Sequence, residues 1–127
     1  MTSSLDLGPF ATSLGLVVDT ADVDEVTAHW QVVAGLLQPH GILHGGAHCS
    51  VVETLASVGA GLWLGDRGRV VGVSNTTDFY RATTQGTLTS TARPVHRGRS
   101  QQVWQVQTTD DERRMVAQGQ VRLQNLG

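Results

Sequence analysis

One segment of this chain has the apolar repeat of a helix, and the other regular segments have the repeat of strands. From residue 46 to residue 64, apolar side chains recur at helical spacing in two rows. The first row is Val51, Leu55, Val58 and Leu62, and the second is Val52, Ala56, Gly59 and Trp63. A helix that is apolar over most of its circumference belongs in a protein interior. The sequence therefore predicts one long buried helix, which Gly65-Asp66 ends.

The segments around this helix alternate between apolar and polar residues, as half-buried strands do. We expect strands at 14–19, 23–33, 69–77, 86–95, 100–109 and 114–124, a loop at 34–45, and a loosely ordered lead-in or short helix at 1–13. Two strands, a buried helix and four more strands predict a single α+β domain over 1–127, with a largely antiparallel sheet wrapped around the helix. The open edge of such a sheet favours pairing with a second copy.

The composition of the chain excludes several classes of function. The chain has 127 residues and a net charge of −2, which argues against nucleic acid or an anionic membrane as the main partner. Its nine basic residues are all arginine, so Schiff-base chemistry on lysine is excluded. The single cysteine, Cys49, excludes an internal disulfide and a cysteine-rich zinc site. We find no secretory signal and no bilayer-spanning apolar run, and we expect a cytoplasmic protein.

Candidate catalytic groups lie at and near the start of the predicted helix. Gly45-Gly46 opens it, and free backbone N–H groups at a helix start can hold a developing negative charge. Glu53 is the only charged residue between Gly41 and Gly65, and its helical neighbours are small. It is either a solvent-facing residue or, as we expect, a catalytic carboxylate facing a cleft. The combination is suited to acyl hydrolysis.

Three histidines, His40, His44 and His48, are spaced four residues apart near this helix start. We expect no zinc site, because the intervening proline and glycines prevent one continuous helix through all three. His44 is expected to be a hydrogen-bonding group, and His48 is expected to face solvent on the first turn. Gln38, in the preceding loop, could hold a water or a carbonyl oxygen.

The densest positive region is His96 to Ser100, with Arg81 and Arg93 nearby in the sequence. It falls at a bend between two predicted strands. It is either a solvated hairpin or a clamp for the phosphates of a nucleotide-like tail.

The string HGGAHCSVVETLAS, preceded by QPHGIL, resembles the hotdog-fold acyl-CoA thioesterases. The similarity extends from about residue 14 to 123 and includes VVGVSNTTDFYRA and RPVHRGRSQQVWQV. It looks closest to the branch of 4-hydroxybenzoyl-CoA thioesterases and of the 1,4-dihydroxy-2-naphthoyl-CoA thioesterases of menaquinone synthesis. The resemblance implies a sheet wrapped around one helix, dimers that share a continuous sheet, often tetramers, and no metal or organic cofactor.

The resemblance also implies roles for individual residues. Glu53 would be the nucleophile or the general base, and the Gly45 N–H would polarise the thioester carbonyl. His44, Gln38 and Ser57 would position the carbonyl or the attacking water. The positions that match coenzyme A or acyl contacts are Gly72, Phe79, Tyr80, Arg81, Ala82, His96, Arg97, Gly98, Arg99, Ser100 and Gln101. In such dimers the acid and some coenzyme A contacts come from different subunits.

Two places depart from the pattern of this family. His48-Cys49 replaces smaller or more apolar residues, and Phe79-Tyr80 makes the pocket segment more aromatic. Both departures bear on which acyl group binds more than on which reaction takes place. We expect a thioesterase for an aromatic or bulky acyl-CoA. The alternatives are a thioesterase for acyl carrier protein or fatty acyl-CoA, an acyl-CoA-binding protein without turnover, and a hydratase.

Overall fold

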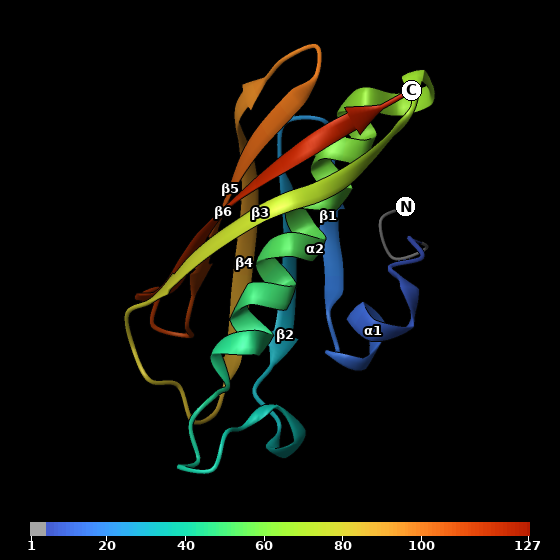
Figure 1. Cartoon of the computed structure of the whole chain (residues 1–127). Helices are drawn as coiled ribbons and strands as arrows, with labels where there is room; N and C mark the ends of the chain where they lie inside the picture. Colours follow the sequence, from blue (N-terminus) through green and yellow to red (C-terminus); the bar gives the residue numbers. More distant parts are fainter. Residues whose placement is uncertain (1–4) are drawn as a thin grey trace.

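The computed structural model describes residues 5–127 as one sheet wrapped around one long helix (Figure 1). Its elements, in chain order, are α1 (Gly8–Ser13), β1 (Val17–Ala21), β2 (Val26–Gln31), α2 (Gly45–Leu64), β3 (Arg69–Phe79), β4 (Thr87–Arg97), β5 (Gln101–Thr109) and β6 (Met115–Leu126). The described strands form a single sheet in the order β1-β2-β4-β5-β6-β3, and each neighbouring pair is antiparallel. The predicted α+β hotdog fold is confirmed.

The alternation that predicted the strands is also what builds the core. Val26, Ala28 and Trp30 of β2 are fully buried, and so are Trp104 and Val106 of β5. These side chains point to the face of the sheet that α2 covers, because residues two apart along a strand share a face. The remaining polar groups on this face are paired.

The indole of Trp30 illustrates this pairing. Its Nε1–H donates to Ser90 Oγ at 3.0 Å, and Ser90 Oγ in turn bonds Thr108 Oγ1 at 2.7 Å. A buried indole N–H or hydroxyl without a partner would cost about 1–3 kcal/mol. These three polar groups of the core therefore satisfy one another.

The central helix begins at Gly45, one residue before the position we expected. Val51, Val52, Leu55 and Ala56 are fully buried, as the two apolar rows predicted. Leu62, at the end of the first row, is instead 39% exposed, because the sheet covers only one side of this part of α2. The helix is thus less enclosed in a single chain than its composition indicated.

Of the predicted lead-in 1–13, residues 8–13 form α1, and residues 1–4 lie outside the described range. Ala11 of this helix and Leu14 after it are buried. Leu14 still has helical backbone angles, so β1 begins at Val17 and not at residue 14 as we expected.

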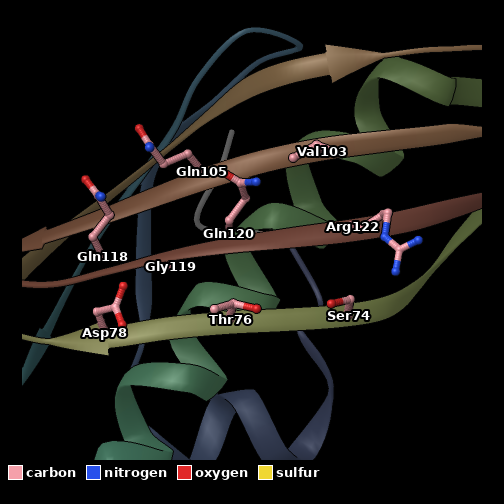
Figure 2. Close-up of a pocket in the computed structure, with 9 residues that line it drawn as sticks. All are labelled: Ser74, Thr76, Asp78, Val103, Gln105, Gln118, Gly119, Gln120 and Arg122. Carbon is pink, nitrogen blue, oxygen red and sulfur yellow. The ribbon is translucent and has the colours of Figure 1, made fainter.

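The opposite face of the sheet is polar. A hollow of about 380 Å³ lies on this outer face, across β3, β5 and β6, and Figure 2 shows the residues that line it. Its lining includes Gln105, Gln118, Gln120, Asp78 and Arg122. None of the residues expected to act in catalysis lines this hollow, so the catalytic site must lie elsewhere.

Strand β3 is the last strand of the sheet and pairs only with β6 among the described strands. It is eleven residues long, and Val71 and Val73 on it are about half exposed. A long edge strand with exposed apolar side chains presents unpaired backbone groups to another strand. This edge lies along α2, so whatever covers β3 also approaches the helix (Figure 1).

Candidate active site

The start of α2 leaves one backbone donor without a partner. His44 is the N-cap residue, and its Nδ1 accepts the Gly46 N–H at 2.7 Å. The Ala47 N–H donates to the His44 carbonyl at 2.9 Å. No acceptor within residues 5–127 takes the Gly45 N–H. The predicted donor is therefore free, and the helix dipole adds positive potential at this point.

The role of His44 follows from the same contact. Because Nδ1 is the acceptor, the proton of the neutral ring lies on Nε2. His44 is exposed, so this Nε2–H can donate to a group that binds at the helix start.

Both glycines have a side chain packed close to the position that a Cβ would take. A Cβ on Gly45 would lie 2.7 Å from the ring of Phe79, and a Cβ on Gly46 would lie 2.9 Å from His44 Nδ1. The first contact places an aromatic ring directly beside the free N–H.

Gln38 lies in the loop that leads into α2, where its backbone pairs with Ile42 and Gly41. Its side-chain Oε1 accepts the His40 N–H. The Nε2 amide group makes no hydrogen bond within the described residues and can donate to a bound carbonyl or water.

Glu53 is exposed in the single chain, beside the edge strand β3. Its Oε1 accepts a long 3.4 Å contact from Asn75 Nδ2, which also donates to the Cys49 carbonyl at 3.0 Å. Gly72 lies against Glu53, since a Cβ there would be 3.3 Å from Glu53 Oε2. The carboxylate thus has little of its hydrogen-bonding capacity engaged.

A cleft of about 370 Å³ opens next to this carboxylate. Glu53, Thr54, Ser57 and Val58 form one wall, and Asp6 and Leu7 close the other side. Ser57 lies one helical turn beyond Glu53, so both point into the same space. The structure therefore places Glu53 and Ser57 together, as predicted.

His48 is only 3% exposed, and the expectation that it faces solvent is wrong. Its ring meets Trp30 edge-on with 5.7 Å between centroids and stacks on Phe79 at 5.8 Å. The His48 Nδ1 is buried and has no hydrogen-bond partner within residues 5–127, and burial lowers the pKa of this side chain to about 4. His48 is therefore neutral near pH 7. Its ring faces the core because the first turn of α2 lies over the sheet.

The three histidines do not converge. His44 caps the helix, and His48 lies in the core. Within residues 5–127 no group of three or more histidine, cysteine, aspartate or glutamate side chains is placed to hold a metal ion. In the same range no helix has both the length and the apolarity that a membrane crossing requires.

Apart from Gly72, which lies against Glu53, the residues expected to contact the substrate divide between the two ends of α2. The segment Phe79 to Ala82 lies by the helix start: Phe79 contacts Gly45, and the Leu43 N–H bonds the Thr83 carbonyl at 2.7 Å. The segment 96–101 lies at the other end. Part of it lines a groove of about 590 Å³ with Trp63 and Arg67.

Within the basic segment, Arg97 has a structural role. It donates to the Val23 carbonyl at 2.6 Å and pairs with Asp24 at 3.1 Å. Arg93 pairs with Glu25 at 2.7 Å. Arg99 makes no ion pair in the described part of the chain and is the arginine of this segment best placed for a ligand phosphate.

A family model described as the thioesterase superfamily matches residues 40–117. The chain belongs to this superfamily. "Putative esterase Rv1847" of Mycobacterium tuberculosis (strain ATCC 25618 / H37Rv) is 49% identical over 121 residues, which cover 93% of this chain and 86% of that protein. "Proofreading thioesterase EntH" of Cronobacter sakazakii is 30% identical over 125 residues, 98% of this chain and 91% of that protein.

Solved structures of similar proteins share the fold over nearly the whole chain. The crystal structure of S. sahachiroi AziG matches with a TM-score of 0.94 and 61% identity, and covers 95% of this chain and 98% of that one. Thioesterase HI1161 from Haemophilus influenzae matches with a TM-score of 0.89 and 25% identity, and covers 99% and 94%.

For a member of the thioesterase superfamily, the distance between the two main candidate groups matters. Gly45 and Glu53 are eight residues apart on one helix, which corresponds to about 12 Å along its axis. A single carbonyl can contact groups only about 3 Å away. Within one chain the Glu53 carboxylate lies against Gly72 and Asn75 of β3 and not beside the Gly45 N–H.

Two parts of this candidate site were missed from the sequence. Asn75 contacts Glu53 at 3.4 Å, and its signal in the sequence was a polar residue on the inward face of β3, opposite Val121 of β6. Asp6 and Leu7 form a wall of the Glu53 cleft, and nothing local in the sequence indicates that contact.

Proposed function

We propose that this protein is an acyl-CoA thioesterase that acts on an aromatic or bulky acyl group, with a 1,4-dihydroxy-2-naphthoyl-CoA-like ester as one candidate substrate. The observation that carries the proposal is the unpaired Gly45 N–H at the start of α2. A backbone donor at a helix start, beside a residue without a side chain, is suited to an oxyanion. The thioesterase EntH, 30% identical, supports the same reaction class.

The site is formed by two chains. A second chain overcomes the separation of about 12 Å between Gly45 and Glu53 if it pairs its β3 with this β3 and lays its α2 antiparallel to this one. The Gly45 of one chain then faces the Glu53 of the other. The exposed edge of β3, with half-exposed Val71 and Val73, supports this arrangement. Two such dimers would give a tetramer.

Hydrolysis then needs only groups that this chain supplies. The thioester carbonyl oxygen accepts the Gly45 N–H, and His44 and Gln38 offer further donors. The Glu53 carboxylate attacks the carbonyl carbon, or takes a proton from a water that attacks it. The carbon–sulfur bond breaks, and coenzyme A leaves as a thiolate, which needs little acid assistance because thiols ionise easily. Attack by Glu53 would give an acyl anhydride that water hydrolyses.

We assign binding of the coenzyme A portion to two segments, the basic segment 96–101 and the aromatic segment 79–82. Arg99 and Ser100 lie on the groove near Trp63 and can contact phosphate oxygens. Tyr80, Arg81 and Ala82 lie by the helix start, where the pantetheine arm would pass. No metal or organic cofactor takes part in this scheme, and we expect a cytoplasmic enzyme.

The direct test is thiol release from a panel of esters, measured with a thiol-reactive dye. The panel holds benzoyl, 4-hydroxybenzoyl, phenylacetyl, dihydroxynaphthoyl, hexanoyl and palmitoyl-CoA. We expect fast release from the aromatic esters, dependent on Glu53, and unchanged after treatment with EDTA. Glu112→Ala, which removes an exposed carboxylate on the β5–β6 turn, is the matched control.

Other outcomes identify the alternatives. Rates that rise with alkyl chain length, or turnover of acyl groups on acyl carrier protein, would replace the aromatic assignment. Tight binding of several esters with no thiol release would indicate an acyl-CoA-binding protein. Loss of enoyl-CoA absorbance without thiol release would indicate a hydratase.

A further inference from the structure

The aromatic cluster at the start of α2 is used by none of the steps above. It consists of Trp30, His48 and Phe79, with His48 between the other two rings. Trp30 is fully buried and His48 is 3% exposed, whereas Phe79 is 53% exposed. The cluster thus extends from the core to the surface and ends in one open aromatic ring.

That open ring lies beside the proposed oxyanion donor. The Phe79 Cε2 and Cζ atoms are both 2.7 Å from the position that a Cβ on Gly45 would occupy. An acyl group whose carbonyl accepts the Gly45 N–H therefore lies within reach of this ring. A flat apolar surface at that distance favours an aromatic group, which can stack on it or meet it edge-on.

His48 determines where the ring lies. Phe79 is the last residue of β3, and the chain beyond it is irregular, so the strand alone does not hold this side chain in one rotamer. The His48 ring is parallel to within 27° and supports the face of Phe79 from the core side. Trp30, at 81° to His48, holds that imidazole in turn.

We infer that His48 is a positioning residue that holds the Phe79 ring beside the Gly45 amide, and that this ring gives the enzyme its preference for planar aromatic acyl groups. This inference rests on the proposed function and adds to it a structural source of substrate choice. It also joins the two departures from the family pattern, since His48 and Phe79 contact one another.

The proposed role requires a flat ring at position 48. The Nδ1 of His48 has no hydrogen-bond partner within residues 5–127, so it is not what holds the ring in place. Stacking does not use the ring nitrogens, so a phenylalanine can take over the support of Phe79, and a leucine cannot.

The test compares benzoyl-CoA with cyclohexanecarbonyl-CoA, which has the same number of carbons in a ring that is not flat. The ratio of kcat/KM for the two esters is measured for wild type, His48→Leu, His48→Phe and Phe79→Leu. We expect wild type to prefer benzoyl-CoA. His48→Leu and Phe79→Leu should lower the ratio about fivefold, mainly through the KM for benzoyl-CoA, and His48→Phe should restore it.

Val106→Ala is the control for general destabilisation, since Val106 is fully buried in β5. It should lower Tm and leave the ratio as in wild type. A ratio near one in wild type, or a ratio that His48→Leu and Phe79→Leu do not change, would overturn the inference and leave the thioesterase assignment standing.

The same two esters are also titrated onto Glu53→Ala protein by calorimetry. Their dissociation constants test the aromatic preference without turnover. If no ester releases thiol in a Glu53-dependent way, the proposed function fails, and this Kd ratio, with and without His48→Leu, still decides the inference: a preference that His48→Leu removes supports it, and equal Kd values contradict it.

Discussion

The two ends of α2 differ in how their backbone groups are satisfied. At the carboxyl end, Arg67 Nε donates to the Leu64 carbonyl at 2.9 Å, and its terminal NH2 group donates to the Trp63 carbonyl at 2.6 Å. The same guanidinium lies 4.4 Å from the centroid of the Trp63 ring. At the amino end, the Gly45 N–H has no partner in the described chain, and neither has His48 Nδ1.

This difference indicates which end serves stability and which serves function. The buried His48 Nδ1 costs about 1–3 kcal/mol when it is left unpaired, whereas the half-buried Gly45 N–H is open to water or to a ligand. Polar groups that lack partners beside a pair of glycines at a helix start are typical of a binding or catalytic site. Substitutions at the amino end should therefore change activity, and substitutions at the carboxyl end should change stability.

The largest effect is expected for Glu53→Ala. Loss of the carboxylate that attacks the thioester or activates water should lower kcat by about 10³-fold or more. Because Glu53 is exposed, Tm should change little. Thiol-release kinetics and a thermal melt check both parts. Activity within a few-fold of wild type would remove Glu53 from the mechanism.

Removal of the Gly45 N–H comes next. Gly45→Pro deletes the donor at the first helical position, where proline is well tolerated, and the preceding His44 already has the extended angles that proline requires. We expect kcat to fall about 10²- to 10³-fold. Gly45→Ala has a Cβ near Phe79 but keeps the N–H. Equal losses in both variants would show that crowding against Phe79, and not the donor, is what matters.

His48 makes stability depend on pH. Its pKa is 6.5 in the unfolded chain and about 4 in the folded protein, because burial disfavours the charged form. The unfolded chain therefore binds the proton more readily as the pH falls. The free energy of unfolding should drop by about 3 kcal/mol between pH 7 and pH 4 through this residue alone. Urea denaturation of wild type and His48→Phe at several pH values isolates the contribution, since other groups titrate equally in both. Parallel curves would contradict it.

Arg67→Ala should have the smallest effect and should act on stability. Two helix-end carbonyls lose their donor, and Trp63 loses the cation above it, so we expect a loss of about 1 kcal/mol. Urea denaturation with Arg113→Ala as an exposed control measures it. If the urea midpoint of Arg67→Ala equals that of wild type, this prediction is contradicted, because water then replaces the arginine without loss of stability.

The sequence predicted the parts of this molecule that depend on local repeats. The buried residues of α2 and the inward faces of β2 and β5 follow from apolar spacing of 3.6 and 2, and both are confirmed. The helix start followed from Gly45-Gly46. Leu62 was misplaced because apolar spacing does not show which sides of the helix the sheet covers.

The missed features depend on contacts between distant segments. His48 reads as a first-turn polar residue until β3 and β2 bring Phe79 and Trp30 to it. Asn75 reaches Glu53 across 22 positions of sequence, and Asp6 reaches the same cleft from the amino end. Whether one chain or two form the site depends on the separation of Gly45 and Glu53, which are eight positions apart on the helix, and on the surface of a partner chain.

Complementation between two inactive variants tests the shared site most directly. Gly45→Pro and Glu53→Ala chains with different affinity tags are coexpressed, and the mixed dimer is purified through both tags. Each variant alone should be inactive. If the Gly45 of one chain works with the Glu53 of the other, the mixed dimer holds one intact site and should show about half of the wild-type kcat per dimer. A mixed dimer as inactive as its parents, beside a fully active wild-type dimer with the same two tags, would contradict a site built from two chains.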